Sequence, residues 1–178
     1  RGFLLMSWPA HLARYYLPTA GFAGAPGAYD AVSSATALSG QPFSQVDLFL
    51  GNIPGCIGEV SKLAILVGFA YLLYARVVEW HIPVVFLGAT ALSAWALGGD
   101  ALRSILTGGV MLGAVFMATD YTSSPMTRKA QYLYAALGGL IVTLIRRFGM
   151  YPEGVTYAIL IMNVATPLMD RLMPDRVY

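Results

Sequence analysis

Residues 63–78 read LAILVGFAYLLYARVV, and Arg76 is the single charged side chain in this run. A helix needs about 20 mainly apolar residues to cross a bilayer, with a range of about 17–25. Because Arg76 stands near the end of the run, its long cationic side chain can reach the polar headgroup region. The stretch therefore predicts a membrane-spanning helix.

Four further segments have the same apolar character, and short connections separate them. They cover residues 82–97, 106–118, 132–145 and 155–169. Short connections favour antiparallel neighbours in a helical bundle. The predicted fold is therefore an all-α integral membrane bundle of five spans, preceded by a glycine-rich segment that could be re-entrant.

The composition agrees with a membrane protein. Hydrophobic residues make up 57% of the 178 residues and charged residues 11%, whereas soluble domains average about 25% charged residues. The net charge of +2 is too small and too scattered to indicate a nucleic-acid partner. Cys56 is the only cysteine, which excludes a disulfide framework and favours a packing role. Without an initiator methionine or a signal peptide, the chain is expected to be the C-terminal half of a longer protein.

Small residues in two of the segments allow helix backbones to approach closely in lipid. Gly138 and Gly139 occur in 132–145, and Gly113 occurs in 106–118. The sequence Thr107-Gly108-Gly109 could instead divide the latter segment into two half-helices, as in transporter-like folds. Both explanations of the glycines remain open at this stage.

Cationic side chains give a weak indication of sidedness. In a five-span arrangement, the side of the C-terminus carries Arg76, Arg128, Lys129, Arg171 and Arg176, and the opposite side carries Lys62, Arg103, Arg146 and Arg147. Cytoplasmic loops are enriched in Lys and Arg. The count therefore favours a cytoplasmic C-terminus by a narrow margin.

Three polar islands interrupt the apolar sequence. We name residues 30–36 (DAVSSAT) the first island, 51–59 (GNIPGCIGE) the second island and 119–129 (TDYTSSPMTRK) the third island. The third follows an apolar segment directly, and the second combines Gly51, Gly55 and Gly58 with Pro54. Three separate clusters of small hydroxyls and glycines favour a buried ligand that bears phosphate or many polar edges.

Each island also has a purely structural explanation. Asp30 and Ser33 could cap a helix that begins near Ala35, and Ser124 could cap a helix with Pro125 in its first turn. The glycines of the second island would equally serve a re-entrant loop that packs on the bundle. A short helix starting near Cys56 would instead direct its positive end toward the glycine loop and favour an anion there.

The islands carry a resemblance to a known family. The spacing from Asp30 to Thr36 resembles the flavinylation motif: an aspartate, two variable residues, Ser or Thr, a small residue, then Ala-Thr. GNIPGCIGEVS and FMATDYTSSPMT resemble the two other signatures of the membrane flavoprotein family that contains the D subunit of the Rnf complex and the B subunit of the sodium-translocating NADH:quinone reductase. The resemblance extends from Phe3 to about Asp170.

Two positions distinguish this chain within that resemblance. Tyr121 follows Asp120, which is similar to the Rnf subunit, whereas the quinone reductase subunit usually has proline there. Ala37 stands where proline commonly follows the motif, although the acceptor hydroxyl of Thr36 is intact.

The resemblance implies an FMN attached to Thr36 as a phosphoester, which a flavin transferase moves there from FAD. Small residues at Ser33, Ser34 and Ala35 would let the transferase approach, and the two hydroxyls could donate to phosphate oxygens. Asp30 would serve recognition by the transferase. The flavin itself carries the redox chemistry, while the protein supplies position and electrostatics.

The other two islands have implied roles around the flavin ring. Asn52, Gly55 and Gly58 would allow close approach to the ring, and Glu59 would act either as a carboxylate in the first turn of a helix or as a group that tunes flavin protonation. Asp120, Thr122, Ser124 and Thr127 would hold the far edge of the first flavin or a second flavin, riboflavin or FMN. Asp100 and Asp120 are functional candidates because carboxylates inside a membrane are costly. No metal site and no catalytic residue are predicted.

The implied function is a one-electron relay between ferredoxin-side and NAD-side redox centres, coupled to Na⁺ or H⁺ movement. The family implies ten spans in two five-span repeats, with membrane lipid, a second covalent-FMN subunit and iron–sulfur subunits as partners, in a bacterial or archaeal cell membrane. Three other functions remain open. The chain could be the related quinone reductase subunit, or, without a flavin, a urea- or ammonium-type channel or a scaffold.

The expected organisation has four parts. Residues 1–29 would be a linker, 30–61 the attachment loop and glycine-rich segment, 62–170 the bundle, and 171–178 a tail. In the family the transferase works outside the cytoplasm, so Thr36 is expected at the extracytoplasmic surface.

Overall fold

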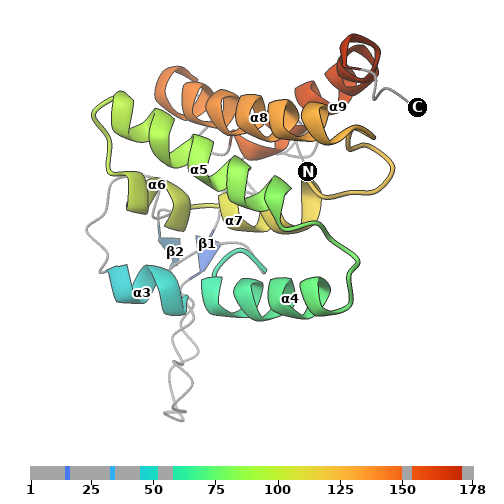
Figure 1. Cartoon of the computed structure of the whole chain (residues 1–178). Coiled ribbons are helices and arrows are strands. Elements are labelled where there is room, and N and C mark those ends of the chain that lie inside the picture. Colours follow the sequence, from blue (N-terminus) through green and yellow to red (C-terminus); the bar gives the residue numbers. More distant parts are fainter. Residues whose placement is uncertain (1–14, 17–32, 35–44, 52–57, 150–153, 174–178) are drawn as a thin grey trace.

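The computed structural model describes residues 15–16, 33–34, 45–51, 58–149 and 154–173, and this part of the chain is predominantly helical (Figure 1). The predicted all-α class is thereby confirmed, with one small exception in a pair of two-residue strands. In chain order the elements are β1 (Tyr15–Tyr16), β2 (Ser33–Ser34), α3 (Gln45–Leu50), α4 (Lys62–Tyr74), α5 (His81–Ala96), α6 (Ala101–Leu106), α7 (Val110–Leu112), the π-helix η2 (Gly113–Met117), α8 (Arg128–Phe148) and α9 (Val155–Leu172).

The ends of the helices follow from local chemistry. Helix α4 begins after Ser61, whose side chain accepts a hydrogen bond from the backbone N–H of Ala64, and it ends at Tyr74. Arg76 has a φ of 56°, in the left-handed region where a right-handed helix cannot continue. Among the described residues, no helix combines the length and the apolar character that a membrane crossing demands.

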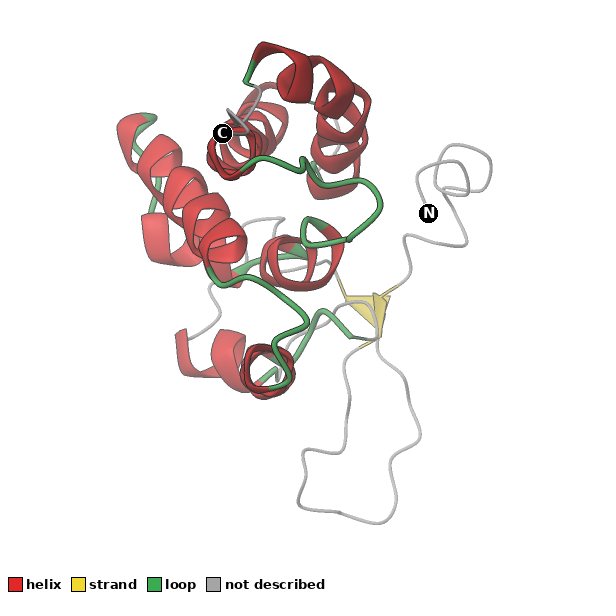
Figure 2. Cartoon of the chain, turned by 45° about the vertical axis from the view of Figure 1, so that its right-hand side comes forward, coloured by secondary structure: helices red, strands yellow, loops and turns green. Residues whose placement is uncertain are grey.

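Along the chain, α4, α5, the segment from α6 to η2, α8 and α9 alternate in direction, so that α5 and α8 run parallel to each other (Figures 1 and 2). We call the end of the bundle that holds the start of α4, the ends of α5 and α8, and helix α6 the first end. The second end holds the end of α4, the start of α5, and the loop that connects η2 to α8. The antiparallel arrangement expected from the short connections is thus present.

Glycines bring α5 and α8 into close contact. A Cβ atom placed on Gly139 would lie 2.5 Å from the carbonyl oxygen of Phe86, and one on Gly138 would lie 2.7 Å from the ring of Phe86. The buried Thr90 hydroxyl donates to the carbonyl of Phe86 at 2.8 Å, and Ser93 bonds to Thr143 of α8 at 2.6 Å. Close helix packing therefore explains this glycine pair, as the sequence predicts.

Gly139→Ala is expected to destabilise the chain by about 1–3 kcal/mol, because the new methyl group meets rigid backbone of α5. The measurement is the unfolding midpoint of the detergent-solubilised subunit in increasing sodium dodecyl sulfate. Gly88→Ala is the matched control on α5, where an added Cβ meets nothing within 4 Å. Equal midpoints for both variants would contradict the close crossing.

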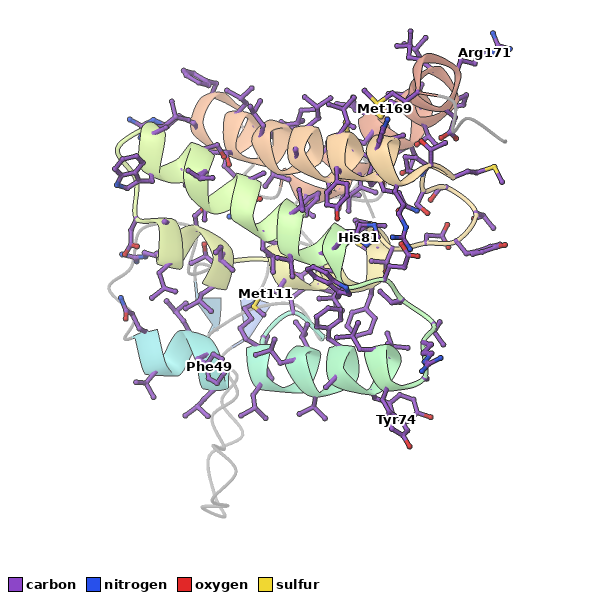
Figure 3. All side chains as sticks on the ribbon, in the orientation of Figure 1. Phe49, Tyr74, His81, Met111, Met169 and Arg171 are labelled. Carbon is purple, nitrogen blue, oxygen red and sulfur yellow. The ribbon has the colours of Figure 1, made fainter. Side chains whose placement is uncertain are left out.

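Buried side chains form two hydrophobic cores. The first core lies among α5, α7, α8 and α9 and includes Phe86, Tyr134, Val142, Ile159 and Met162. The second core lies among α3, α4, α6 and α7 and comprises Leu48, Ile65, Leu106, Met111 and Val115. Figure 3 shows Met111 on the side of α7 that faces α3 and α4. The segment from Val110 to Ala118 contributes to both cores.

The predicted interruption of the third apolar segment is present. Helix α6 ends at Leu106, Thr107 is extended, and Gly108 has a φ of 63° before α7 begins at Val110. Beyond α7 the helix widens into η2, where the N–H of Ala118 bonds the carbonyl of Gly113 at 2.7 Å. We call residues 107–109 the helix break.

Candidate functional site

The first island is described only at Ser33 and Ser34. These residues form β2, which pairs antiparallel with β1 so that Ser34 faces Tyr15 and Ser33 faces Tyr16. Ser33 is therefore part of an extended pair. Asp30, Ala35 and Thr36 lie outside the described residues, as does the helix start expected near Ala35.

The second island is described at both of its ends. Gly51 and Gly58 have φ values of 95° and 93°, which side-chain-bearing residues rarely adopt. A Cβ on Gly51 would lie 2.9 Å from the backbone nitrogen of Ser61, so the chain's own backbone makes that close approach. Beside Gly58 nothing lies within 4 Å. Asn52, Gly55 and the expected helix start at Cys56 are outside the described residues.

Glu59 and Lys62 are buried beside the helix break. Their exposed fractions are 7% and 1%. The Lys62 ammonium donates to the carbonyl of Glu59 and, at 2.9 Å, to the carbonyl of Gly108. A Cβ on Gly109 would lie 3.0 Å from the carboxyl carbon of Glu59, so this carboxylate lies against the break. Lys62 thus links the turn before α4 to the interrupted helix.

A second cation holds the other side of the break. The guanidinium of Arg146 on α8 donates to the carbonyl of Ser104 at 2.7 Å and to that of Thr107 at 2.9 Å. Carbonyls at the end of a helix lack intrahelical donors, and charged donors form the stronger hydrogen bonds to them. Lys62 and Arg146 together stabilise a backbone geometry that the helices alone would leave unsatisfied.

The structure around the helix break corrects the expectation for Glu59. It also identifies Lys62 and Arg146 as residues that stabilise the break. Glu59 does not lie in the first turn of a helix, because α4 starts at Lys62 with Ser61 as its cap. In the sequence, Lys62 and Arg146 are recognisable only as charged residues that flank apolar segments. A lysine inside a glycine-rich flank gives no sign that its partner, Gly108, lies 46 positions away.

In the third island, Asp120 organises its own loop. Its carboxylate accepts hydrogen bonds from the hydroxyls of Thr122 at 2.6 Å and Ser123 at 2.9 Å. These two hydroxyls lower the pKa of Asp120 below its usual value, which keeps this exposed carboxylate ionised at neutral pH. Asp120 and Thr122 are therefore bonded to each other within the loop.

Two capping expectations change. Helix α8 begins at Arg128, and the side chain of Thr127 accepts from the N–H of Ala130 at 3.3 Å, so the predicted Ser124 cap with a helical Pro125 is wrong. Pro125 instead offers its carbonyl to the side chain of Gln131 at 3.0 Å. Asp100 is an exposed N-cap of α6 rather than a carboxylate inside the bundle, with Oδ1 at 3.0 Å from the N–H of Leu102.

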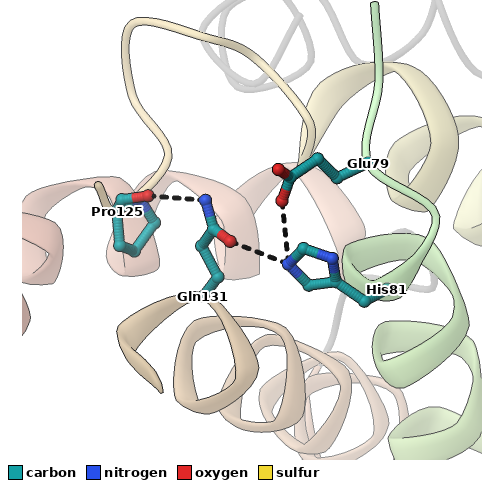
Figure 4. A network of polar contacts seen from close by, with 4 residues as sticks. All are labelled: Glu79, His81, Pro125 and Gln131. Carbon is teal, nitrogen blue, oxygen red and sulfur yellow. Dashed lines mark hydrogen bonds and ion pairs between the residues drawn. The ribbon is translucent and has the colours of Figure 1, made fainter. Parts of the chain in front are cut away.

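A polar network at the second end fixes the third island (Figure 4). Nε2 of His81, at the start of α5, lies 2.7 Å from Oε1 of Gln131 and 3.2 Å from a carboxylate oxygen of Glu79. Because both partners accept, Nε2 carries the proton. Thr166 of α9 donates to the carbonyl of Ser123 at 3.0 Å. The loop is thereby bonded to α9 and, through Gln131 and the carbonyl of Pro125, to α8, and Gln131 in turn contacts His81 of α5.

The described parts of the second and third islands do not converge. Glu59 lies at the helix break, before α7 begins, whereas Asp120 follows η2 at the second end. The whole segment of α7 and η2 therefore separates them.

Comparison with known proteins places this helical chain in a family. The model of the NQR2, RnfD, RnfE family matches residues 1–178, so the chain belongs to that family. The chain is 46% identical over 188 residues to the D subunit of the Na(+)-translocating ferredoxin:NAD(+) oxidoreductase complex of Acetobacterium woodii. That match covers 100% of this chain and 56% of the relative.

Two further relatives have related names. The D subunit of the proton-translocating ferredoxin:NAD(+) oxidoreductase complex of Clostridium ljungdahlii is 37% identical over 96% of this chain and 56% of its own length. The D subunit of the ion-translocating oxidoreductase complex of Citrobacter koseri is 39% identical over 75% of this chain and 40% of its own length. The chain thus spans about half the length of the curated relatives it matches.

Proposed function

We propose that the chain is part of the D subunit of an Rnf-type complex, in which it relays electrons through an FMN bound covalently to Thr36. The relay would be coupled to Na⁺ or H⁺ movement, with ferredoxin- and NAD-side centres in partner subunits. The observation that carries this proposal is the motif from Asp30 to Thr36, in a chain similar over its whole length to subunits named for that chemistry.

The described part of the first island fits a modification segment. Ser33 and Ser34 are extended and paired with β1, so the backbone leading to Thr36 does not continue a helix. A bound flavin supplies reversible one-electron chemistry, and the chain's own residues position it. Thr36 provides the hydroxyl oxygen, and Asp30 provides a carboxylate for the transferase.

The transfer of FMN from FAD to Thr36 needs no oxidant or reductant. The oxygen of Thr36 bonds to the flavin-side phosphorus of FAD, the P–O bond to the adenylate breaks, and AMP leaves. The hydroxyl proton passes to a base of the transferase or to water. No electrons are transferred in this step, so the flavin arrives oxidised and only later takes part in the relay.

A membrane location is supported by the outer faces of the helices. Large apolar side chains on α4, α5 and α9 are exposed, among them Val67, Tyr71, Leu92, Val164 and Leu168. Large apolar side chains exposed on several helices favour contact with lipid or with another protein. In the proposed five-span topology, Thr36 lies on the extracytoplasmic side and the third island on the cytoplasmic side.

Thiol labelling in whole cells checks this topology. In a Cys56→Ser background, Ser34→Cys is expected to react with an impermeant maleimide from outside. Tyr121→Cys, at a position 96% exposed in the third island, should react only after permeabilisation. The opposite pattern would overturn the proposed sidedness. Ala130 is unsuitable as a reporter because it is fully buried.

In-gel flavin fluorescence tests the function directly. The denatured chain is expected to fluoresce as a flavin after electrophoresis, because a phosphoester bond survives denaturation while bound riboflavin does not. A dark band from cells that contain FAD and an active flavin transferase would refute the proposal and favour a channel or a scaffold. The quinone reductase subunit would fluoresce too, and Tyr121 after Asp120 is the sequence feature that favours the Rnf branch.

A second flavin at the third island has weaker support. The hydroxyls of Thr122 and Ser123 already donate to Asp120, and Thr127 caps α8. These groups are therefore occupied by their own loop, and a ligand there would have to displace those bonds.

A further inference from the structure

A cavity of about 400 Å³ opens at the first end of the bundle, among the ends of α5 and α8 and helix α6. It is lined by three arginines, Arg103, Arg146 and Arg147, and by the hydroxyl-bearing residues Ser104, Thr107 and Thr143. None of these residues belongs to the three polar islands, so the proposed flavin chemistry leaves the cavity without a role.

The cavity is cationic. Among the described residues that line it, Asp100 is the one carboxylate, against three guanidinium groups. Asp100 uses an oxygen to cap α6, and Arg146 bonds the carbonyls of Ser104 and Thr107, so these two residues build the wall. Arg103 is half-buried and Arg147 lies beside it on the cavity wall, and both bring further positive charge to the same space. Guanidinium groups pair with phosphate oxygens in bidentate geometry.

On both long helices, exposed apolar side chains are close in sequence to residues that line the cavity. On α5, next to the lining residue Ala94, Trp95 is 71% exposed. On α8, next to Arg147, Phe148 is 75% exposed, and Leu144 of the preceding turn is also exposed. Tryptophan and arginine at the same end of a helical bundle are typical of the level at which helices meet lipid headgroups.

We propose that this cavity binds the phosphodiester headgroup of an anionic phospholipid. The inference rests on the membrane location proposed above. Arg103 and Arg147 hold the phosphate, while the acyl chains lie along the exposed apolar faces of α5 and α8. The two guanidinium groups match the single negative charge and the paired oxygens of such a phosphodiester. A free phosphate would use the arginines but would leave Trp95 and Phe148 without a partner.

The test measures lipid binding to the solubilised full-length protein. Phosphatidylglycerol, phosphatidylcholine with the same acyl chains, and inorganic phosphate are titrated separately, and bound lipid is counted by native mass spectrometry. We expect phosphatidylglycerol to bind about tenfold more tightly than phosphatidylcholine. Arg147→Gln should weaken phosphatidylglycerol binding about fivefold, and Arg103→Gln should add to this loss.

Arg171→Gln is the matched control, because Arg171 is an exposed arginine in the last turn of α9, away from the cavity (Figure 3). Its lipid preference should equal that of the wild-type chain. Equal affinity for the two lipids, or an unchanged preference in the Arg103→Gln/Arg147→Gln variant, would overturn the proposal. Competition by inorganic phosphate at the lipid's own concentration would assign the cavity to free anions instead.

Failure of this inference can be told apart from failure of the proposed function. Flavin fluorescence of the same preparation reports on Thr36 and does not depend on the arginines. Extraction of membranes with alkaline carbonate reports on membrane location. A fluorescent, carbonate-resistant protein with no lipid preference would therefore refute the lipid site alone.

Discussion

Thr36→Ala is expected to abolish the flavin fluorescence of the denatured protein completely. Alanine has no oxygen that could bridge to the phosphate, so no other contact in the loop can restore the bond. The measurement compares in-gel fluorescence and intact mass of the wild-type and variant proteins from the same cells. The wild-type mass should exceed the sequence mass by one FMN phosphoryl group, and the variant mass should equal the sequence mass.

Thr36→Ser and Ser34→Ala are the matched controls. Serine at position 36 keeps the bridging oxygen, and Ser34→Ala removes a neighbouring hydroxyl but leaves Thr36 in place. Both variants should retain fluorescence, with reduced loading where the transferase prefers threonine. Fluorescence that persists in Thr36→Ala but disappears in Ser34→Ala would move the attachment point two residues upstream.

The second large effect is expected at Lys62. Lys62→Met keeps the length of the buried stem but removes both charged hydrogen bonds to the carbonyls of Glu59 and Gly108. It also leaves the carboxylate of Glu59, 7% exposed, without the ammonium that attracts it. Leaving a buried hydrogen-bonding group without its partner costs about 1–3 kcal/mol, and two carbonyls lose a charged donor here. The unfolding midpoint in mixed detergent micelles should fall accordingly.

A double variant distinguishes the charge effect from simple packing. In Lys62→Met/Glu59→Gln the carboxylate becomes neutral, so much of the lost stability should return. The coupling between the two substitutions then measures the electrostatic part. Additive losses would show that Lys62 acts only through packing and through the two carbonyls. Lys62→Arg is a further control that keeps the charge but changes the donor geometry.

Much of the helical fold follows from the sequence because apolar runs and glycines act locally. The segments predicted at 82–97 and 155–169 correspond to α5 (His81–Ala96) and α9 (Val155–Leu172). The break at Thr107-Gly108-Gly109, one of two explanations that the glycines allow, is present, since Gly108 adopts a positive φ. The apolar run at 63–78 extends past Tyr74, the last residue of α4. Nothing in the local sequence indicates the left-handed backbone at Arg76, beyond which the helix does not continue.

The candidate site was less predictable because its contacts are long-range. Hydroxyls and a proline suggested a cap at Ser124, but Gln131 and Asp170 bond the Pro125–Met126 segment and delay the helix until Arg128. Lys62 and Arg146 could not be found from spacing, since the carbonyls they bind come from distant turns. The motif around Thr36 depends on recognition by another enzyme, and it therefore remains a prediction.

The segment from Val110 to Ala118 has a mechanical consequence. Val110, Ala114 and Ala118 are buried in the first core, while Met111 and Val115 are buried in the second. Two cores that shared no element could melt in separate steps, each with its own exchange rate for backbone amides. Because the segment from Val110 to Ala118 contributes buried side chains to both cores, opening of one core removes packing contacts from the other. The two cores are therefore joined into one cooperative unit through the segment from Val110 to Ala118, and Leu87 of α5 packs against both of them.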